Sequence, residues 1–184
     1  GDDVTIYPFD ESKVEDPSLI IYSPVKCAKD TLIVTNGDQT DTVYDFIMDG
    51  KTFEQALDTR EFEPDAPNFT PRISAAVKFD NDDFSYKMSI LKSADEKGSA
   101  CARFTFAYPS ICGCGHFLHT YVCDGNPIPT FQGEPERVAL IDDIDEFTNE
   151  IWSNLDGNNK ISLYVRYTDI TTGKYIDRLI NKNQ

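Results

Sequence analysis

The chain has 184 residues and a formal net charge of −15 at pH 7. No stretch rich in lysine or arginine offsets that charge, so binding to nucleic acid or to an anionic membrane surface is not expected. The sequence has no run of 18 apolar residues and no signal peptide, and five cysteines without a regular spacing are typical of a reducing compartment. We therefore expect one cytoplasmic domain spanning residues 1–184.

Short strands are expected first, at Val4 to Ile6 and at Leu19 to Tyr22. A β-branched run from Thr31 to Thr35 then has the composition of a buried strand. It stops at Asn36-Gly37, a pair that tolerates positive φ and turns the chain.

A helix is expected after this turn. Good N-cap residues stand before an apolar helical spacing, and Gly50 ends the pattern. The N-cap candidates are Asp38, Thr40, Asp41 and Thr42. A helix N-terminus has free backbone N–H groups and a partial positive charge, which suits an anion, although an ordinary strand–turn–helix connection has the same pattern.

A second helix is predicted from Phe53 to about Arg60, with Thr52 as its cap. The segment between Arg60 and Arg72 then contains three prolines within eight residues. Prolines exclude a helix here, so we expect a stiff, extended loop that positions something.

Strand patterns dominate the rest of the chain, apart from one clear helix whose apolar stripe includes Trp152, expected in the core. The strands are expected at 73–79, 84–91, 101–108, 116–123, 161–168 and 175–181, and the helix is expected between a cap at 142 or 143 and Gly157. Antiparallel strand runs beside grouped helices indicate an α+β fold.

The segment Cys112-Gly-Cys114-Gly-His116 suggests a zinc site at first sight. The cysteine spacing is C-x-C rather than C-x-x-C, and beyond His119 no second ligand pair exists, so no metal is predicted. On a regular strand, His116 and His119 would point to opposite faces. We expect each of them to be a hydrogen-bonded structural residue.

Two motifs resemble a known family. Thr35-Asn-Gly-Asp-Gln-Thr-Asp-Thr42 resembles the S/T-N-G-x-x-T-D-T signature of the archaeal-type IMP cyclohydrolases, and Asn68-Phe-Thr-Pro-Arg-Ile73 resembles their N-T-P-R-I segment with Phe69 inserted. Bacterial IMP cyclohydrolase-like proteins are similar over nearly the whole chain. The resemblance implies a four-layered α-β-β-α sandwich with the architecture of N-terminal-nucleophile hydrolases, mainly antiparallel sheets and no autocatalytic nucleophile.

The resemblance also implies an activity: closure of the purine ring of formyl-aminoimidazole carboxamide ribotide to inosine monophosphate, with loss of water and without a cofactor. This chemistry needs a proton acceptor, a group that stabilises an oxyanion and an anchor for the phosphate. By motif match, Tyr22, Glu63 and Arg72 are the expected catalytic residues. The expected substrate-binding residues are Lys26, Asn36, Gly37, Asp38, Thr40, Asp41 and Thr42.

Two alternatives remain at this point: a nucleotide-binding relative without catalytic activity, and an amidohydrolase that acts on another substrate. Family members begin with a strand hairpin and an arginine-containing segment, and this chain opens with Gly1 in place of Met. We therefore expect the domain to lack an N-terminal segment. The expected partner is a purine nucleotide, and a homo-oligomer is an open alternative.

Overall fold

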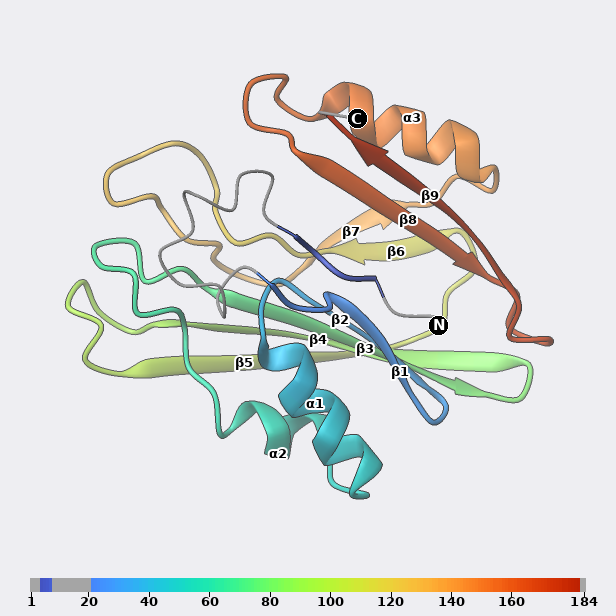
Figure 1. Cartoon of the computed structure of the whole chain (residues 1–184), viewed down its shortest axis with the longest axis horizontal. Helices are drawn as coiled ribbons and strands as arrows, with labels where there is room; N and C mark the ends of the chain where they lie inside the picture. Colours follow the sequence, from blue (N-terminus) through green and yellow to red (C-terminus); the bar gives the residue numbers. More distant parts are fainter. Residues whose placement is uncertain (1–3, 8–20, 183–184) are drawn as a thin grey trace.

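In a computed structural model, residues 4–7 and 21–182 are described. Their largest unit is a five-stranded antiparallel sheet in which the strands follow one another in chain order (Figure 1). Its strands are β1 (Val25–Ala28), β2 (Thr31–Thr35), β3 (Arg72–Asp80), β4 (Asp83–Ser93) and β5 (Cys101–Pro109). The predicted strand at Thr31–Thr35 is therefore confirmed, and it lies between β1 and β3.

Tight turns set the register of this sheet. Lys29 adopts a positive φ of 56° in the turn between β1 and β2, which places Ala28 opposite Thr31. Asn81 adopts a φ of 54° between β3 and β4, which places Asp80 opposite Asp83. Asparagine tolerates this left-handed conformation better than most residues, which explains its place in the second turn.

Two helices, α1 (Gln39–Met48) and α2 (Phe53–Leu57), cover one face of the five-stranded sheet (Figure 1). A fully buried cluster joins the helices to the sheet, with Val43 of α1 and Phe53 of α2 packed among residues such as Ile33 of β2. As predicted, Thr52 caps α2. Its hydroxyl accepts from the Gln55 backbone while the Gln55 side chain accepts from the Thr52 backbone, a complete capping box.

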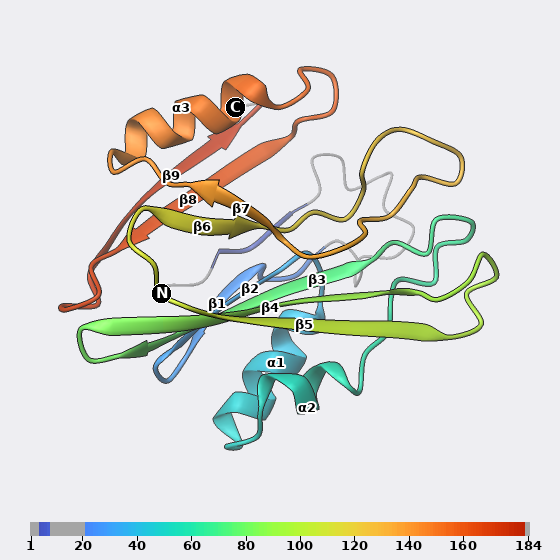
Figure 2. The ribbon, with the colours of Figure 1, turned by 180° about the vertical axis from the view of Figure 1, so that it is seen from behind.

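The other face of the sheet carries the second half of the chain. It consists of two β-hairpins and a helix: β6 (Cys114–Phe117) with β7 (Glu136–Ala139), β8 (Ser162–Thr168) with β9 (Tyr175–Asn181), and α3 (Ile144–Asn154). Seen from either side, α3 lies on the outer side of the β8–β9 hairpin, away from the five-stranded sheet (Figure 2). The fold is α+β, and every sheet in the described residues is antiparallel, as expected.

Several predicted boundaries were wrong. Leu19 lies outside the described residues, and Ile21 and Tyr22 belong to no strand, whereas β1 begins three residues later. The strand predicted at 116–123 is only Cys114–Phe117, and β7 replaces what the sequence indicated as loop. Helix α2 ends at Leu57 rather than near Arg60.

The helix predicted to end at Gly157 ends at Asn154, because Leu155 already has an extended backbone. Trp152 of this helix is half-buried rather than in the core, and the ammonium group of Lys160 lies over its ring. Among the described helices, none is long and apolar enough to cross a membrane.

Candidate functional site

The turn after β2 is held by side chains that point inward. The Thr35 and Thr40 hydroxyls lie 2.6 Å apart, and both donate to the carbonyl of Gly37. The Asn36 amide donates to the carbonyl of Pro71, and its oxygen accepts from the backbone N–H of Ile73 at 2.9 Å. Asn36 therefore joins the turn to the start of β3. Together with Thr35 and Thr40, it fixes the conformation of the turn that borders the site.

The proline-rich loop between Arg60 and Arg72 returns the chain to the same place. The backbone N–H of Glu63 donates to the carbonyl of Thr70 at 2.9 Å, which closes the loop on itself. Thr70 also donates from its backbone N–H to Asp65 at 2.6 Å. The inserted Phe69 adopts a φ of 45°, and its ring lies edge-on to that of Phe62. The loop contains no helix, as its prolines predicted, but it folds back on itself rather than running extended as expected.

Arg72 is the centre of the candidate site. It is only 5% exposed, and its Nη1 atom lies 2.6 Å from Oδ1 of Asp38, 2.7 Å from Oε1 of Gln39 and 3.8 Å from Oε1 of Glu63. Buried arginines are stable only when charged and polar groups surround them in this way. The two motifs identified in the sequence thus meet at this guanidinium.

Gly37 makes room for this arrangement. A Cβ atom at position 37 would lie 2.4 Å from Nη1 of Arg72 and 2.6 Å from Oε1 of Gln39. Both distances are too short for real Cβ contacts. The sequence suggested that Gly37 was needed for a positive φ, but the structure shows a steric requirement, since Gly37 is not among the residues with positive φ.

Asp38 stands at the N-cap position of α1 but makes no capping hydrogen bond. Its carboxylate instead accepts from Arg60 at 2.6 Å and contacts Arg72. Burial alone would raise the pKa of Asp38, but the hydrogen bond from Arg60 and the charges of the two arginines outweigh burial and lower that pKa. The Asp38 carboxylate thus provides the negative charge near the N-terminus of α1 that the sequence analysis considered for a bound anion.

Unlike Asp38, both Glu63 and Tyr22 have a raised pKa. Burial raises the pKa of Glu63; Arg72 opposes this effect, and the charges of Asp65 and Asp38 add to it. Burial also raises the pKa of Tyr22, with a further contribution from the charge of Glu63 and an opposing one from Arg72. The three predicted catalytic residues therefore lie within electrostatic range of one another. A carboxyl group of raised pKa exchanges protons at a higher pH than an ordinary glutamate does, and a phenol of raised pKa stays protonated at neutral pH.

Not every predicted substrate-binding residue joins this cluster. Lys26 and Asp41 form an ion pair with each other at 2.6 Å, and Lys26 also lies over the ring of Tyr44. Thr40 is fully buried under the turn, and Thr42 is half-buried in the first turn of α1. Beside the buried Arg72, the side chains of Asp38, Glu63 and Arg60 reach solvent and are 38%, 21% and 25% exposed.

Arg60 was not identified from the sequence as a site residue, and Asp65, Thr70 and Tyr121 were also missed. The Tyr121 hydroxyl lies 2.6 Å from the Thr70 hydroxyl, which in turn donates to Asp65. The charges of Asp65 and Glu63 contribute, after burial, to a raised pKa of Tyr121. The three prolines indicated that the loop has a positioning role. No pattern in the sequence, however, connects Thr70 of this loop to Tyr121, which lies 51 residues further along the chain.

The two histidines do not share a site, as expected. Nδ1 of His116 forms a hydrogen bond with the Tyr86 hydroxyl at 2.6 Å, and the His116 ring stacks on Tyr108. His119 bonds through Nδ1 to the carbonyl of Tyr121 at 2.7 Å. Within residues 4–7 and 21–182, no three His, Cys, Asp or Glu side chains are placed to hold a metal ion.

A comparison with known protein families assigns the chain to one family. The family described as IMP cyclohydrolase-like protein matches residues 1–174, almost the whole sequence. The chain therefore belongs to this family, as its two motifs indicated. No curated protein matches the sequence significantly.

Proposed function

We propose that the protein is an IMP cyclohydrolase that closes the purine ring of formyl-aminoimidazole carboxamide ribotide. Family membership supports the class of reaction, and one observation supports the position of the active site in the structure. That observation is the half-buried Glu63 carboxylate with a raised pKa, 3.8 Å from the buried Arg72 and within the electrostatic range of Tyr22. Perturbed titratable groups of this kind are typical of catalytic sites.

In the proposed reaction, the carboxamide nitrogen attacks the formyl carbon. The new C–N bond forms as that nitrogen gives one proton to the Glu63 carboxylate, and the formyl oxygen becomes an oxyanion. The Tyr22 phenol is the proposed proton donor to this oxygen, because a raised pKa keeps the phenol protonated at neutral pH. The hydroxyl so formed then leaves as water with the proton held by Glu63. The nitrogen that carried the formyl group loses its proton as the C=N bond forms, and this proton restores Tyr22.

The arginines have different proposed roles. Arg72 is buried and already contacts two carboxylates, so its main effect is to hold Glu63 in place and set its charge. Arg60 is partly exposed and shares the Asp38 carboxylate, so it is the cation closest to solvent at this site and a candidate for the oxyanion or the phosphate. No step in this scheme requires a cofactor.

We also propose that the fold is the four-layered α-β-β-α sandwich expected from the resemblance, with the architecture of N-terminal-nucleophile hydrolases. The position of α1 and α2 on one side of the five-stranded sheet, and of the hairpins and α3 on the other, supports this proposal (Figures 1 and 2). Five free cysteines support a cytoplasmic location.

The direct test is to incubate this chain with the formylated ribotide and follow inosine monophosphate by absorbance. We expect formation well above the uncatalysed rate and proportional to protein concentration. Stabilisation by the ribotide without turnover would instead identify a nucleotide-binding relative. Turnover of a different amide substrate alone would identify an amidohydrolase.

A further inference from the structure

Gln39 is a fully buried residue of the candidate site to which the reaction proposed above gives no role. It is the first residue of α1 and occupies one of the two variable positions of the T-N-G-x-x-T-D-T turn, so the motif did not identify it. Its side chain is 0% exposed. A buried amide is costly unless its polar atoms have partners, so the contacts of Gln39 indicate what holds it in place.

Hydrogen bonds fix the orientation of this amide. Oε1 accepts from Nη1 of Arg72 at 2.7 Å, and Nε2 donates to Oδ1 of Asn36 at 3.0 Å and to the carbonyl of Ile73 at 3.1 Å. Arginine can only donate and a carbonyl oxygen can only accept, so a rotation of the amide by half a turn would break these contacts. Gln39 therefore presents its oxygen, and not its nitrogen, to the buried guanidinium.

The contact with Gln39 limits what Arg72 can do for Glu63. Nη1 of Arg72 carries two N–H groups. Oε1 of Gln39 and Oδ1 of Asp38 lie 2.7 Å and 2.6 Å from this nitrogen. Oε1 of Glu63 lies 3.8 Å from it, too far for a hydrogen bond. Glu63 thus lies close to the positive charge of Nη1 but receives no hydrogen bond from it.

Asp38 shows what such a hydrogen bond does to a carboxylate at this site. Burial would raise the pKa of Asp38, but the hydrogen bond from Arg60 at 2.6 Å and the charges of both arginines lower it. Burial also raises the pKa of Glu63, and there the charge of Arg72 does not outweigh it. Charge-assisted hydrogen bonds are stronger than contacts without a hydrogen bond, which accounts for the difference between the two carboxylates.

The distance between Arg72 and Glu63 therefore controls how easily Glu63 loses its proton. The charged and titratable groups that face Glu63 come from several elements: Arg72 of β3, Asp38 of the turn before α1, Asp65 of the proline-rich loop, Tyr22 before β1 and Tyr121 after β6. Arg72 is the cation in this set. A closer approach by its guanidinium would stabilise the Glu63 anion and weaken it as a base.

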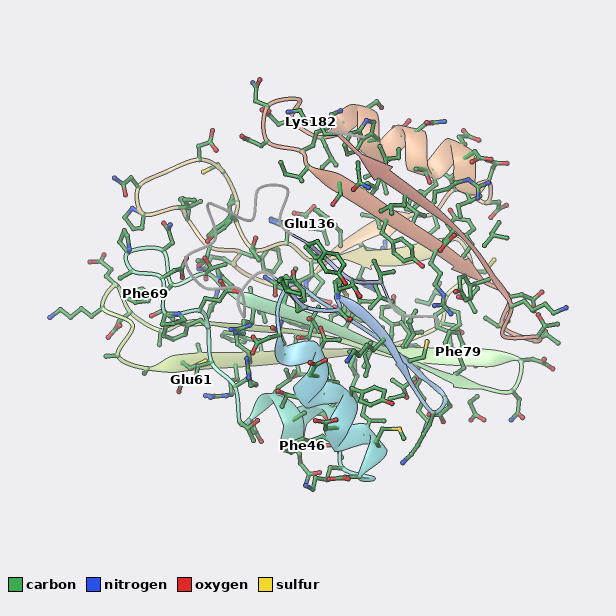
Figure 3. All side chains as sticks on the ribbon, in the orientation of Figure 1. Phe46, Glu61, Phe69, Phe79, Glu136 and Lys182 are labelled. Atoms are coloured by element: carbon green, nitrogen blue, oxygen red, sulfur yellow. The ribbon has the colours of Figure 1, made fainter. Side chains whose placement is uncertain are left out.

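The contact lies where the proline-rich loop meets the five-stranded sheet. Arg72 is the first residue of β3, and Phe79 lies near the other end of this strand. Figure 3 shows Glu61 and Phe69, from the proline-rich loop, at one end of the five-stranded sheet and Phe79 at the opposite end. Gln39 thus acts at the loop end of the sheet, on an arginine 33 residues further along the chain.

We propose that Gln39 is a positioning residue of the active site: its oxygen competes with Glu63 for Nη1 of Arg72 and keeps the guanidinium out of hydrogen-bonding distance of Glu63. The carboxylate then stays available to take the proton of the attacking nitrogen, a role that rests on the proposed function. Glutamine suits this position because its oxygen accepts a hydrogen bond without adding a charge that would neutralise Arg72.

Gln39→Met removes the amide and keeps a side chain of similar length. Without the competing acceptor, Nη1 of Arg72 should form a hydrogen bond with Glu63 and lower the pKa of that carboxyl group. We expect the acid limb of kcat/KM to move to lower pH by at least about half a unit, and kcat/KM at pH 7 to fall at least about tenfold. Gln55→Met is the matched control. Gln55 is exposed on α2, and loss of its capping contact should affect stability but not the acid limb.

Gln39→Glu should move the acid limb in the opposite direction. The new side chain keeps an oxygen beside Nη1 of Arg72 and adds a negative charge close to Glu63, so the limb should move to higher pH by at least about half a unit. This variant decides the question where Gln39→Met does not fold. A limb that stays in place in the folded variants, or that Gln55→Met shifts equally, would overturn the proposal. Failure of both Gln39 variants to fold would make Gln39 a structural residue and overturn it as well.

The pKa of Glu63 can also be measured without turnover, by NMR titration of the chain labelled with ¹³C-glutamate. Glu63→Gln assigns the resonance. We expect a lower pKa in Gln39→Met and a higher one in Gln39→Glu. These shifts in a protein whose wild type has no turnover would refute the proposed cyclohydrolase and support the role of Gln39. Turnover by the wild type without these shifts in the variants would leave the proposed function intact and overturn the inference about Gln39.

Discussion

The Nη1 atom of Arg72 lies 2.6 Å from Oδ1 of Asp38, which joins the two sequence motifs of this chain through one buried ion pair. Asp38 belongs to the turn after β2, and Arg72 opens β3 after the proline-rich loop. The same carboxylate also holds Arg60, so one aspartate fixes both arginines of the site. The geometry of the candidate site therefore depends on this contact.

Replacement of Asp38 by asparagine should destabilise the fold at neutral pH, because Arg72 would lose its closest carboxylate while buried. We expect a loss of about 2 kcal/mol, less than is typical of a fully buried pair, because the Asp38 side chain is 38% exposed. The pKa of Asp38 is lowered in the folded state, so its stabilising effect is fully present above the unfolded pKa of about 3.9 and is lost progressively as the pH falls from there through the lower folded pKa.

Urea unfolding at pH 7 and at pH 3 tests this prediction. The difference between wild type and Asp38→Asn should be larger at pH 7 than at pH 3. Asp41→Asn is the matched control, since Asp41 is exposed and its pair with Lys26 should contribute little. An equal effect of the two substitutions at pH 7 would show that the Asp38 contact has no special importance.

Gly37→Ala should be harmful for a steric reason. The new methyl group would meet the buried Arg72 and Gln39 side chains, which cannot move aside without losing their contacts. We expect a loss of about 1–3 kcal/mol, as for other overpacked sites, and a large decrease in turnover. Gly157→Ala is the control, because nothing lies within 4 Å of a Cβ at that position. Thermal unfolding that is unchanged by Gly37→Ala would contradict the close approach.

Glu63→Gln separates catalysis from stability. Burial raises the pKa of Glu63, so its charge is unfavourable to folding, and that cost appears as the pH rises from the unfolded pKa of about 4.3 through the higher folded value. We therefore expect Glu63→Gln to be at least as stable as wild type at pH 7 and equal to it well below pH 4. Turnover should fall by at least about a hundredfold.

The same residue predicts the pH dependence of turnover. If Glu63 accepts the proton, kcat/KM of the wild type should fall on the acid side with a midpoint above the ordinary glutamate value. This limb should disappear in the residual activity of Glu63→Gln. A strong loss of thermal stability in that variant at pH 7 would instead make Glu63 a structural ion-pair partner of Arg72.

Tyr121→Phe tests the contact between the proline-rich loop and the segment after β6. The substitution removes the hydroxyl that lies 2.6 Å from the Thr70 hydroxyl, so we expect a loss of about 1 kcal/mol. The loop should open more often, and trypsin should cleave after Arg60 faster than in wild type. Tyr108→Phe, which removes a more distant and exposed contact to Glu134, is the control. Equal cleavage rates in both variants would argue against this role of Tyr121.

Local patterns predicted the strand–turn–helix unit at 31–50 well, because a β-branched run, an Asn-Gly pair and a helical apolar spacing all act within a few residues. Strand β1 was missed because Lys26 and Cys27 interrupt its apolar pattern, and its pairing with β2 is what makes it a strand. Strands β6 and β7 likewise depend on each other, with His116 opposite Arg137 across 21 residues.

Motif matches identified three residues that the structure brings together, whereas residues that join them only through three-dimensional contacts, such as Arg60, were missed. Glu63, Arg72 and Tyr22 came from motif match, and the structure brings them within electrostatic range of one another. The N-cap role of Asp38 was predicted from propensity, but Arg60 and Arg72, at the two ends of the proline-rich loop, contact its carboxylate instead. Such contacts depend on three-dimensional proximity and cannot be read from local sequence.

The most direct test of the proposed function compares inosine monophosphate formation by wild type and by Glu63→Gln, at pH 7 and at equal protein concentration. The proposed mechanism predicts clear turnover by the wild type and a loss of at least about a hundredfold in the variant, whose thermal unfolding should be no less cooperative. Equal rates for the two proteins, or no product from a folded wild type that binds the ribotide, would contradict it.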